Sequence, residues 1–125
     1  MAIDWKRFCE LVRGHRSFVL VSHVRPDCDA LGSELGMALV LDALGKQVEI
    51  INAHETPANL AFIDPARRIR TLGKNANAED VAKCDCVMVL DTSAWIQLGA
   101  MADAIRASQA KRIVLDHHVS EDDLG

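Results

Sequence analysis

The sequence is poor in aromatic residues and in residues that break regular structure. It contains no tyrosine, two tryptophans and three phenylalanines among 125 residues. Seven glycines and three prolines are too few for a collagen-like or low-complexity chain, and the apolar residues, 50% of the total, are spread along the whole length. A chain of this size buries roughly two-thirds of the surface that its unfolded form exposes. The composition therefore predicts one globular domain that needs no disulfides.

Several motifs and long apolar segments are also missing. The sequence has no Cys-x-x-Cys, no N-terminal stretch typical of a signal peptide, and no apolar run near the roughly 20 residues of a membrane-spanning helix. We therefore predict a reduced, cytoplasmic protein that does not bind membranes. Cys9, Cys28, Cys84 and Cys86 are interpreted as small buried hydrophobic residues, with zinc bound by the Cys84-x-Cys86 pair and a third cysteine as the alternative.

Positive charge is not in excess. The chain has 14 basic and 18 acidic residues, and a net charge of −4 has the wrong sign for a protein that coats nucleic acid through charge alone. The excess equals the number of aspartates in the segments interpreted below as one site, Asp27, Asp29, Asp91 and Asp116. Gathered carboxylates are usually balanced by hard divalent cations.

Short β-branched runs alternate with longer helical stretches. The predicted strands are residues 17–22, 46–51, 86–90 and 111–115. The predicted helices are one after Asp4, residues 30–44 and 98–108, and short turns at 58–63 and 79–83. This alternation predicts βαβ crossovers and an α/β fold, a three-layer, Rossmann-like domain with a parallel sheet. No Gly-x-Gly-x-x-Gly follows the first strand, which argues against a dinucleotide-binding domain.

Three of the four predicted strands end on groups that bind metals. His23 follows the first strand, Asp91 the third, and Asp116-His117-His118 the fourth. Ligand sites of open parallel sheets lie beyond the carboxyl ends of the strands, at the point where the strand order changes direction. We therefore expect these side chains to converge in space although they are far apart in the sequence.

The segment 23–33 leaves a strand and enters a helix. The Asp27-x-Asp29 spacing sends two carboxylates to neighbouring positions, and Asp29 also stands where a helix N-cap is expected. Gly32 and Ser33 are expected near the helix start, where unpaired backbone N–H groups suit a phosphate oxygen. Aspartate and histidine without thiolate favour manganese, magnesium or cobalt over structural zinc. Two such ions would activate water for in-line attack on phosphorus, so phosphoester hydrolysis is the expected reaction class.

Together, the segment 23–33, the strand-end Asp91 and the run Asp116-His117-His118 resemble the DHH phosphoesterase family, whose name repeats that last run. The chain most resembles the short bacterial enzymes of the nano-RNase type. That branch hydrolyses very short oligoribonucleotides, as an exonuclease, and 3′-phosphoadenosine 5′-phosphate. The resemblance implies short RNA oligonucleotides or nucleoside bisphosphates as substrates.

The resemblance also implies two sets of metal ligands. His23, Asp27 and Asp91 would bind one manganese ion, and Asp29, Asp91 and His117 would bind a second, with Asp91 as the bridge. Magnesium and cobalt are the alternative metals.

The same resemblance assigns roles to the remaining residues of the pattern. His118 matches the substrate-side histidine that contacts the phosphoryl group or the leaving oxygen, and Asp116 would orient the neighbouring imidazoles. Relatives often carry an arginine where Gln97 stands here.

The family's last metal-binding aspartate and its basic, Gly-rich C-terminal domain do not occur before Gly125. We therefore expect residues 1–125 to be the N-terminal part of a truncated DHH catalytic domain, with the C-terminal substrate-binding domain absent. Two copies of the chain, a homodimer, are an alternative to a monomer. The alternatives are an exopolyphosphatase or pyrophosphatase of the same family, and a non-catalytic regulatory module that binds metal or nucleotide.

Overall fold

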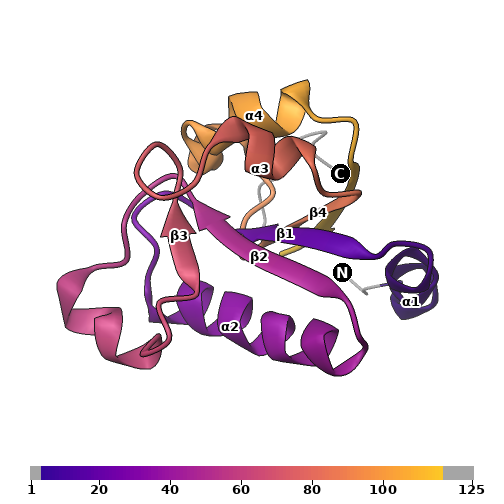
Figure 1. The fold of residues 1–125 in the computed structure, drawn as a ribbon, viewed down its shortest axis with the longest axis horizontal. Coiled ribbons are helices and arrows are strands. Elements are labelled where there is room, and N and C mark those ends of the chain that lie inside the picture. Colours follow the sequence, from indigo (N-terminus) through magenta and orange to yellow (C-terminus); the bar gives the residue numbers. More distant parts are fainter. Residues whose placement is uncertain (1–3, 117–125) are drawn as a thin grey trace.

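The computed structural model of the chain describes residues 4–116, and its centre is a parallel β-sheet (Figure 1). The strand order is β3-β2-β1-β4-β5, and every neighbouring pair is parallel. The strands are β1 Ser17–Val21, β2 Gln47–Asn52, β3 Ile69–Thr71, β4 Cys86–Leu90 and β5 Lys111–Leu115. The predicted α/β fold with a parallel sheet is confirmed.

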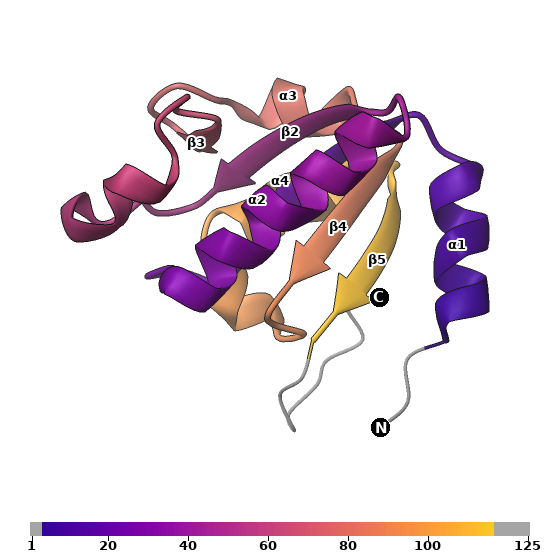
Figure 2. The ribbon, with the colours of Figure 1, turned by 90° about the horizontal axis from the view of Figure 1, so that it is seen from below.

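Helices cover both faces of this sheet. They are α1 Trp5–Arg13, α2 Cys28–Ala43, α3 Ala78–Ala82 and α4 Met101–Ala107, with 3-10 helices η1 Ala58–Ile63 and η2 Trp95–Leu98. Helix α2 lies along one face, and α3 and α4 lie on the other (Figures 1 and 2). No helix in residues 4–116 is both long and apolar enough to cross a membrane.

The core consists of two apolar clusters, one on each face of the sheet. Along β1, Phe18 and Leu20 pack in the cluster that contains α1 and α2 residues, whereas Val19 and Val21 pack in the cluster of α3 and α4. Side chains of a strand alternate between faces, so a strand with both faces covered is apolar throughout. This double burial explains why β1 and β4 were recognisable as uninterrupted apolar runs.

The cysteines divide into two buried and two exposed residues. Cys84 packs in the α3–α4 cluster and Cys86 in the α2 cluster, so they lie on opposite faces of the sheet. Burial raises the pKa of the Cys86 thiol to about 12. The interpretation as buried hydrophobic residues holds for this pair and is wrong for Cys9 and Cys28, which are exposed. Within residues 4–116, the group of side chains that could hold a metal ion does not include these cysteines, which argues against the zinc alternative.

Two elements differ from the sequence expectation. Strand β3 falls in residues 52–73, where no strand was predicted, because its three residues are too few to form a recognisable pattern and it is held at the sheet edge by pairing with β2. The helix expected over 98–108 is divided into η2 and α4 by Gly99, whose φ of 56° interrupts the helical path.

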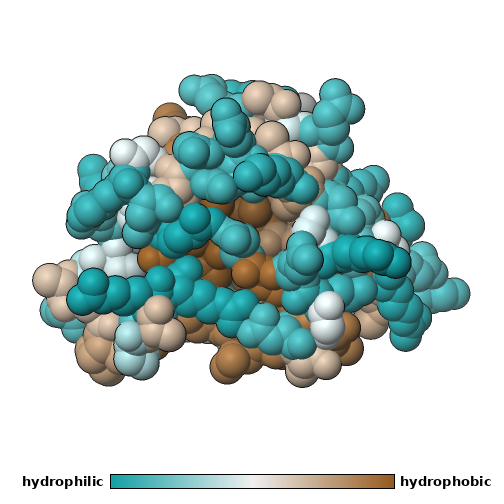
Figure 3. Space-filling model, in the orientation of Figure 1, coloured by the Kyte–Doolittle hydropathy of each residue, from teal (hydrophilic) through white to brown (hydrophobic). Residues whose placement is uncertain are grey.

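Helix α2 carries apolar side chains on its outer surface as well as on its inner one. Leu39, Val40 and Leu44 are each more than half exposed. Apolar atoms accordingly appear along the lower edge of the molecule in Figure 3, where α2 runs in the same view, below a surface that is mostly hydrophilic. Apolar residues in this helix therefore do not all mark its buried face.

Candidate metal centre

The candidate site lies where β1 and β4 end. These strands are direct neighbours, with Val21 paired to Val89. His23 follows β1 and Asp91 follows β4. The chain runs from β1 to β2 on one side, whereas β4 and β5 lie on the other, so the strand order changes direction between β1 and β4. This is the position at which open parallel sheets bind their ligands.

The ring of His23 is oriented by its own turn. Its Nδ1 lies 2.8 Å from the carbonyl oxygen of Val24. Because a carbonyl oxygen only accepts hydrogen bonds, Nδ1 is the nitrogen that donates, and the lone pair of a neutral ring is then on Nε2. Nε2 lies 3.2 Å from Oδ2 of Asp91. A hydrogen bond at the second ring nitrogen is the usual way in which proteins orient a histidine that binds a metal.

Asp91 stands in an uncommon backbone conformation directly after β4. Its φ is 64°, and its side chain is 5% exposed. Aspartate is one of the few residues other than glycine that adopts this left-handed region readily. The Asp91 N–H donates to the carbonyl oxygen of Leu115 at 2.9 Å, which ties the turn to β5. Such backbone outliers persist where surrounding contacts hold them, and they concentrate at functional sites.

Asp27 caps helix α2 and also faces His23. Its Oδ1 accepts a hydrogen bond from the Ala30 N–H at 2.8 Å and lies 3.8 Å from Nε2 of His23. The predicted cap at Asp29 is therefore wrong: α2 starts at Cys28, and Asp29 lies inside its first turn. Asp27 has the extended backbone of a capping residue. The sequence alone does not show which of the two aspartates caps the helix, because both are equally suitable.

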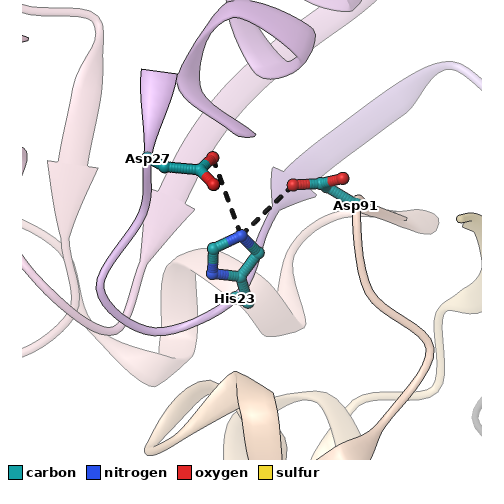
Figure 4. Close-up of side chains that lie close together, drawn as sticks. All are labelled: His23, Asp27 and Asp91. Atoms are coloured by element: carbon teal, nitrogen blue, oxygen red, sulfur yellow. Dashed lines mark hydrogen bonds and ion pairs between the residues drawn. The ribbon is translucent and has the colours of Figure 1, made fainter. Parts of the chain in front are cut away.

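His23, Asp27 and Asp91 form one cluster (Figure 4), with one ligand atom from each within 4.8 Å of the others. Nε2 and the two carboxylates are all acceptors when the ring is neutral, so they repel one another unless a proton or a cation lies between them. Separations of 3.2 and 3.8 Å suit neighbouring ligands of an ion that is bound at about 2.0–2.2 Å. The donor set thus fits a divalent cation, and it is the one such group found within residues 4–116.

Asp91 lies on the border between two cavities. One, of about 460 Å³, is lined by His23 and Asp27, and the other, of about 390 Å³, by Asp29 and Asp116. Asp91 lines both. The structure therefore gathers Asp29, Asp91 and Asp116 around one cavity, as expected from their places in the sequence.

The other predicted residues are placed less directly. Gly32 and Ser33 were expected near the start of a helix, and α2 starts one turn before them, at Cys28, so their backbone N–H groups lie inside the helix. The Ser33 side chain lines the cavity beside Asp29, and Gly32 is exposed on the same helix. His117 and His118 lie outside the described residues.

Sequence reasoning missed a buried polar network next to the site. Ser22, Glu34 and Asn52 are at most 1% exposed. Asn52 Nδ2 donates to Glu34 Oε1 at 2.8 Å, and the Ser22 N–H donates to Asn52 Oδ1 at 3.1 Å. Burial raises the pKa of Glu34 to about 8, against the opposing effect of its hydrogen bonds. A signal was present, because Glu34 falls on the same helix face as the apolar residues Leu31 and Leu41.

A second missed feature joins the two loops that carry the site. The Val24 N–H donates to the carbonyl oxygen of Gln97 at 2.6 Å. A Cβ on Gly99 would lie 2.8 Å from Cγ1 of Val24 and 3.3 Å from Cβ of Ala53. The loop after β4 therefore packs against the loop after β1 at a distance that only glycine permits. Gln97 also lines the cavity of His23.

Comparison with known proteins agrees with this architecture. The sequence model described as the DHH family, N-terminal domain, matches residues 17–124. The chain belongs to the DHH family. The fold is similar to that of an exopolyphosphatase-related protein from Bacteroides fragilis, with a TM-score of 0.88 and 29% sequence identity. That match covers 95% of this chain and 36% of the other, so this chain spans about a third of its length. The predicted family is confirmed, and the nano-RNase branch stays a prediction.

Proposed function

We propose that this chain is the N-terminal catalytic part of a two-metal phosphoesterase that hydrolyses short oligoribonucleotides, 3′-phosphoadenosine 5′-phosphate, or both. The observation that carries the proposal is the cluster of His23, Asp27 and Asp91 at the switch point of a DHH-family sheet. A substrate-binding domain that follows in the same polypeptide is part of the proposal.

The proposed ligands form two sets that share one aspartate. His23, Asp27 and Asp91 hold the first ion, and Asp29, Asp91 and His117 hold the second. The position of Asp91 between the two cavities supports its role as the bridge. The proposed metal is manganese, with magnesium or cobalt as alternatives, because oxygen and imidazole ligands suit these ions. Bound ions of this kind lower the pKa of water and stabilise negative charge on phosphoryl oxygens.

The remaining residues act on the substrate or on the ligands. In this proposal His118 contacts the phosphoryl group or the leaving oxygen, and Asp116 orients the neighbouring imidazoles. In the same proposal Ser33, which lines the cavity beside Asp29, contacts a phosphate oxygen, with Gly32 next to it. The hydrogen bond from His23 Nδ1 to Val24 keeps Nε2 directed at the carboxylates.

A matched pair of variants tests the proposed metal site. Asp85 and Asp91 flank the two ends of β4, and Asp85 accepts hydrogen bonds from the backbone N–H groups of Arg16 and Ser17 far from the site. Since changes to residues that only support metal ligands cost about 10–100-fold in affinity or activity, we expect Asp91→Asn to cost at least about 100-fold. Asp85→Asn should keep manganese affinity and turnover. Equal binding and turnover in both variants would contradict the proposal.

The substrate is tested by parallel reactions with manganese. A ribotrinucleotide, 3′-phosphoadenosine 5′-phosphate, polyphosphate and pyrophosphate are incubated with the protein, and released nucleotide and phosphate are quantified by chromatography. We expect turnover of the two nucleotide substrates. Turnover of polyphosphate or pyrophosphate alone would favour the second candidate, which the exopolyphosphatase-related neighbour supports.

A non-catalytic regulatory module is the alternative from another class. Calorimetric titration of the folded protein with manganese separates it from the enzyme. Two ions per chain together with turnover support the phosphoesterase. Fewer than two ions, with no turnover of any of the four substrates, support the regulatory form.

A further inference from the structure

The buried network of Ser22, Glu34 and Asn52 joins three elements around the candidate site. Ser22 directly follows β1, Asn52 is the last residue of β2, and Glu34 lies in the second turn of α2. Strand β1 leads into His23, and helix α2 is capped by Asp27. The network is therefore placed where it fixes these elements relative to each other.

Core packing alone does not explain Glu34. Its Oε2 is buried and has no hydrogen-bond partner among residues 4–116, and burying an unsatisfied polar atom costs free energy. Leu31, Ala38 and Leu41 share its helix face and are fully buried. An apolar residue at position 34 would continue this stripe without that cost. The polar residue is thus expected to serve a purpose other than burial of apolar surface.

Glu34 and Ser22 together determine which way the Asn52 amide faces. An asparagine amide has an oxygen that accepts and a nitrogen that donates, and either orientation fills the same space. The Glu34 Oε1 accepts from Nδ2, so Oδ1 is directed toward Ser22, whose N–H donates to it at 3.1 Å. Without an acceptor at position 34, Nδ2 loses its partner, and only the N–H and the hydroxyl of Ser22, 3.1 and 3.4 Å from Oδ1, hold the amide in this orientation.

His23 is held through its backbone on both sides. On one side, the Ser22 N–H is bound by Asn52, and on the other the Val24 N–H is bound by the Gln97 carbonyl oxygen. The His23 ring in turn donates to the Val24 carbonyl oxygen. The direction of Nε2 therefore depends on a backbone segment that is fixed at its two ends.

We propose that Glu34 is a positioning residue of the candidate metal site: by orienting Asn52 it fixes the Ser22 backbone and so the direction in which His23 presents Nε2. The predicted effect on metal binding rests on the proposed function, whereas the predicted effect on the orientation of His23 rests on the hydrogen-bond network alone. Glu34 does not contact the ion or the substrate in this proposal.

Four variants, one of them a control, test the proposal. Glu34→Gln keeps the acceptor oxygen, and Glu34→Met removes it with an apolar side chain of similar length. Leu41→Ala is the matched control, because Leu41 is a buried residue of the same helix two turns further on and its loss lowers stability without touching the network. Asn52→Ser breaks the same connection from the other side, so the test also holds if Glu34→Met does not fold.

Two measurements are made on each folded variant. Imidazole ¹H–¹⁵N spectra of the metal-free protein report which His23 nitrogen carries the proton, and calorimetric titration reports manganese affinity. We expect Glu34→Met and Asn52→Ser to lose the uniform Nδ1–H form and at least about tenfold in affinity, and Glu34→Gln to stay within about twofold. Leu41→Ala should lower stability and leave both readouts unchanged.

The outcomes separate this inference from the proposed function. An unchanged His23 spectrum and unchanged affinity in folded Glu34→Met and Asn52→Ser would overturn the inference, as would an equal effect of Leu41→Ala on the spectrum. If the parent protein binds no manganese, the proposed function fails, and the spectrum of the metal-free protein alone decides whether Glu34 positions His23.

Discussion

Replacing Gly99 with alanine should lower stability strongly, because two separate penalties meet at this residue. Gly99 has φ 56° and ψ −135°, a conformation that glycine adopts readily and other residues rarely adopt. Holding a residue with a Cβ in such a region costs about 1–3 kcal/mol. The new Cβ would also lie 2.8 Å from Cγ1 of Val24, and relieving such overpacking costs about 1–3 kcal/mol.

The sum is a loss of about 2–6 kcal/mol in the free energy of unfolding. Urea denaturation followed by circular dichroism measures it, and for a small domain the midpoint should fall by about 1 M or more. The matched control is Gly36→Ala in the interior of α2, where no atom lies within 4 Å of the new Cβ. This control should gain about 0.5–1 kcal/mol, because alanine is the better helix former.

A double variant separates the two penalties. Val24→Ala removes Cγ1, so combining it with Gly99→Ala should recover the steric part and leave the backbone strain. The two changes should therefore be non-additive by about 1 kcal/mol or more. A Gly99→Ala protein that unfolds at the parent's urea concentration, or a double variant whose losses simply add, would refute the reasoning from close packing.

Two further predictions concern buried titratable groups. Glu34 keeps its proton up to about pH 8 in the folded protein and loses it near pH 4.5 in the unfolded chain. Between these values the folded protein binds the extra proton, so the free energy of unfolding falls as pH rises, by about 1.4 kcal/mol per pH unit. Glu34→Gln should remove this contribution, and urea unfolding of both proteins across this range measures it; parallel pH profiles would contradict it. Iodoacetamide should alkylate the exposed Cys9 and Cys28 in the folded protein. Cys84 and Cys86 should react only after unfolding, because they are buried and burial raises the pKa of both thiols. Mass spectrometry of folded and unfolded samples measures this, and alkylation of Cys86 in the folded protein would contradict its burial.

The sequence was most informative where both faces of an element are buried. Strands β1 and β4 are apolar throughout and could be located closely, and their polar end residues His23 and Asp91 could be expected to converge once a parallel sheet was inferred. Strand β3 could not be found in the same way, because its three residues owe their conformation to pairing with β2 and not to their own pattern.

The details inside the site depended on atomic contacts that a pattern does not contain. Asp27 and Asp29 are equally good capping residues, and only the path of the turn decides between them. The closeness of Gly99 to Val24 joins residues that are 75 positions apart, so no local spacing could indicate it. Glu34 was recognisable as a polar residue on an apolar stripe, but its partner Asn52 comes from another strand.

Asp27 takes part in two interactions, so binding of an ion at the proposed site and formation of the first turn of α2 would affect each other. The same carboxylate closes the first turn of α2 through the Ala30 amide and faces His23. Any force that draws this carboxylate toward an ion also changes the capping bond, and a well-formed cap holds the carboxylate ready for the ion. The exchange rate of the Ala30 amide proton is therefore expected to change when the proposed site takes up an ion, which makes it a backbone reporter of occupancy.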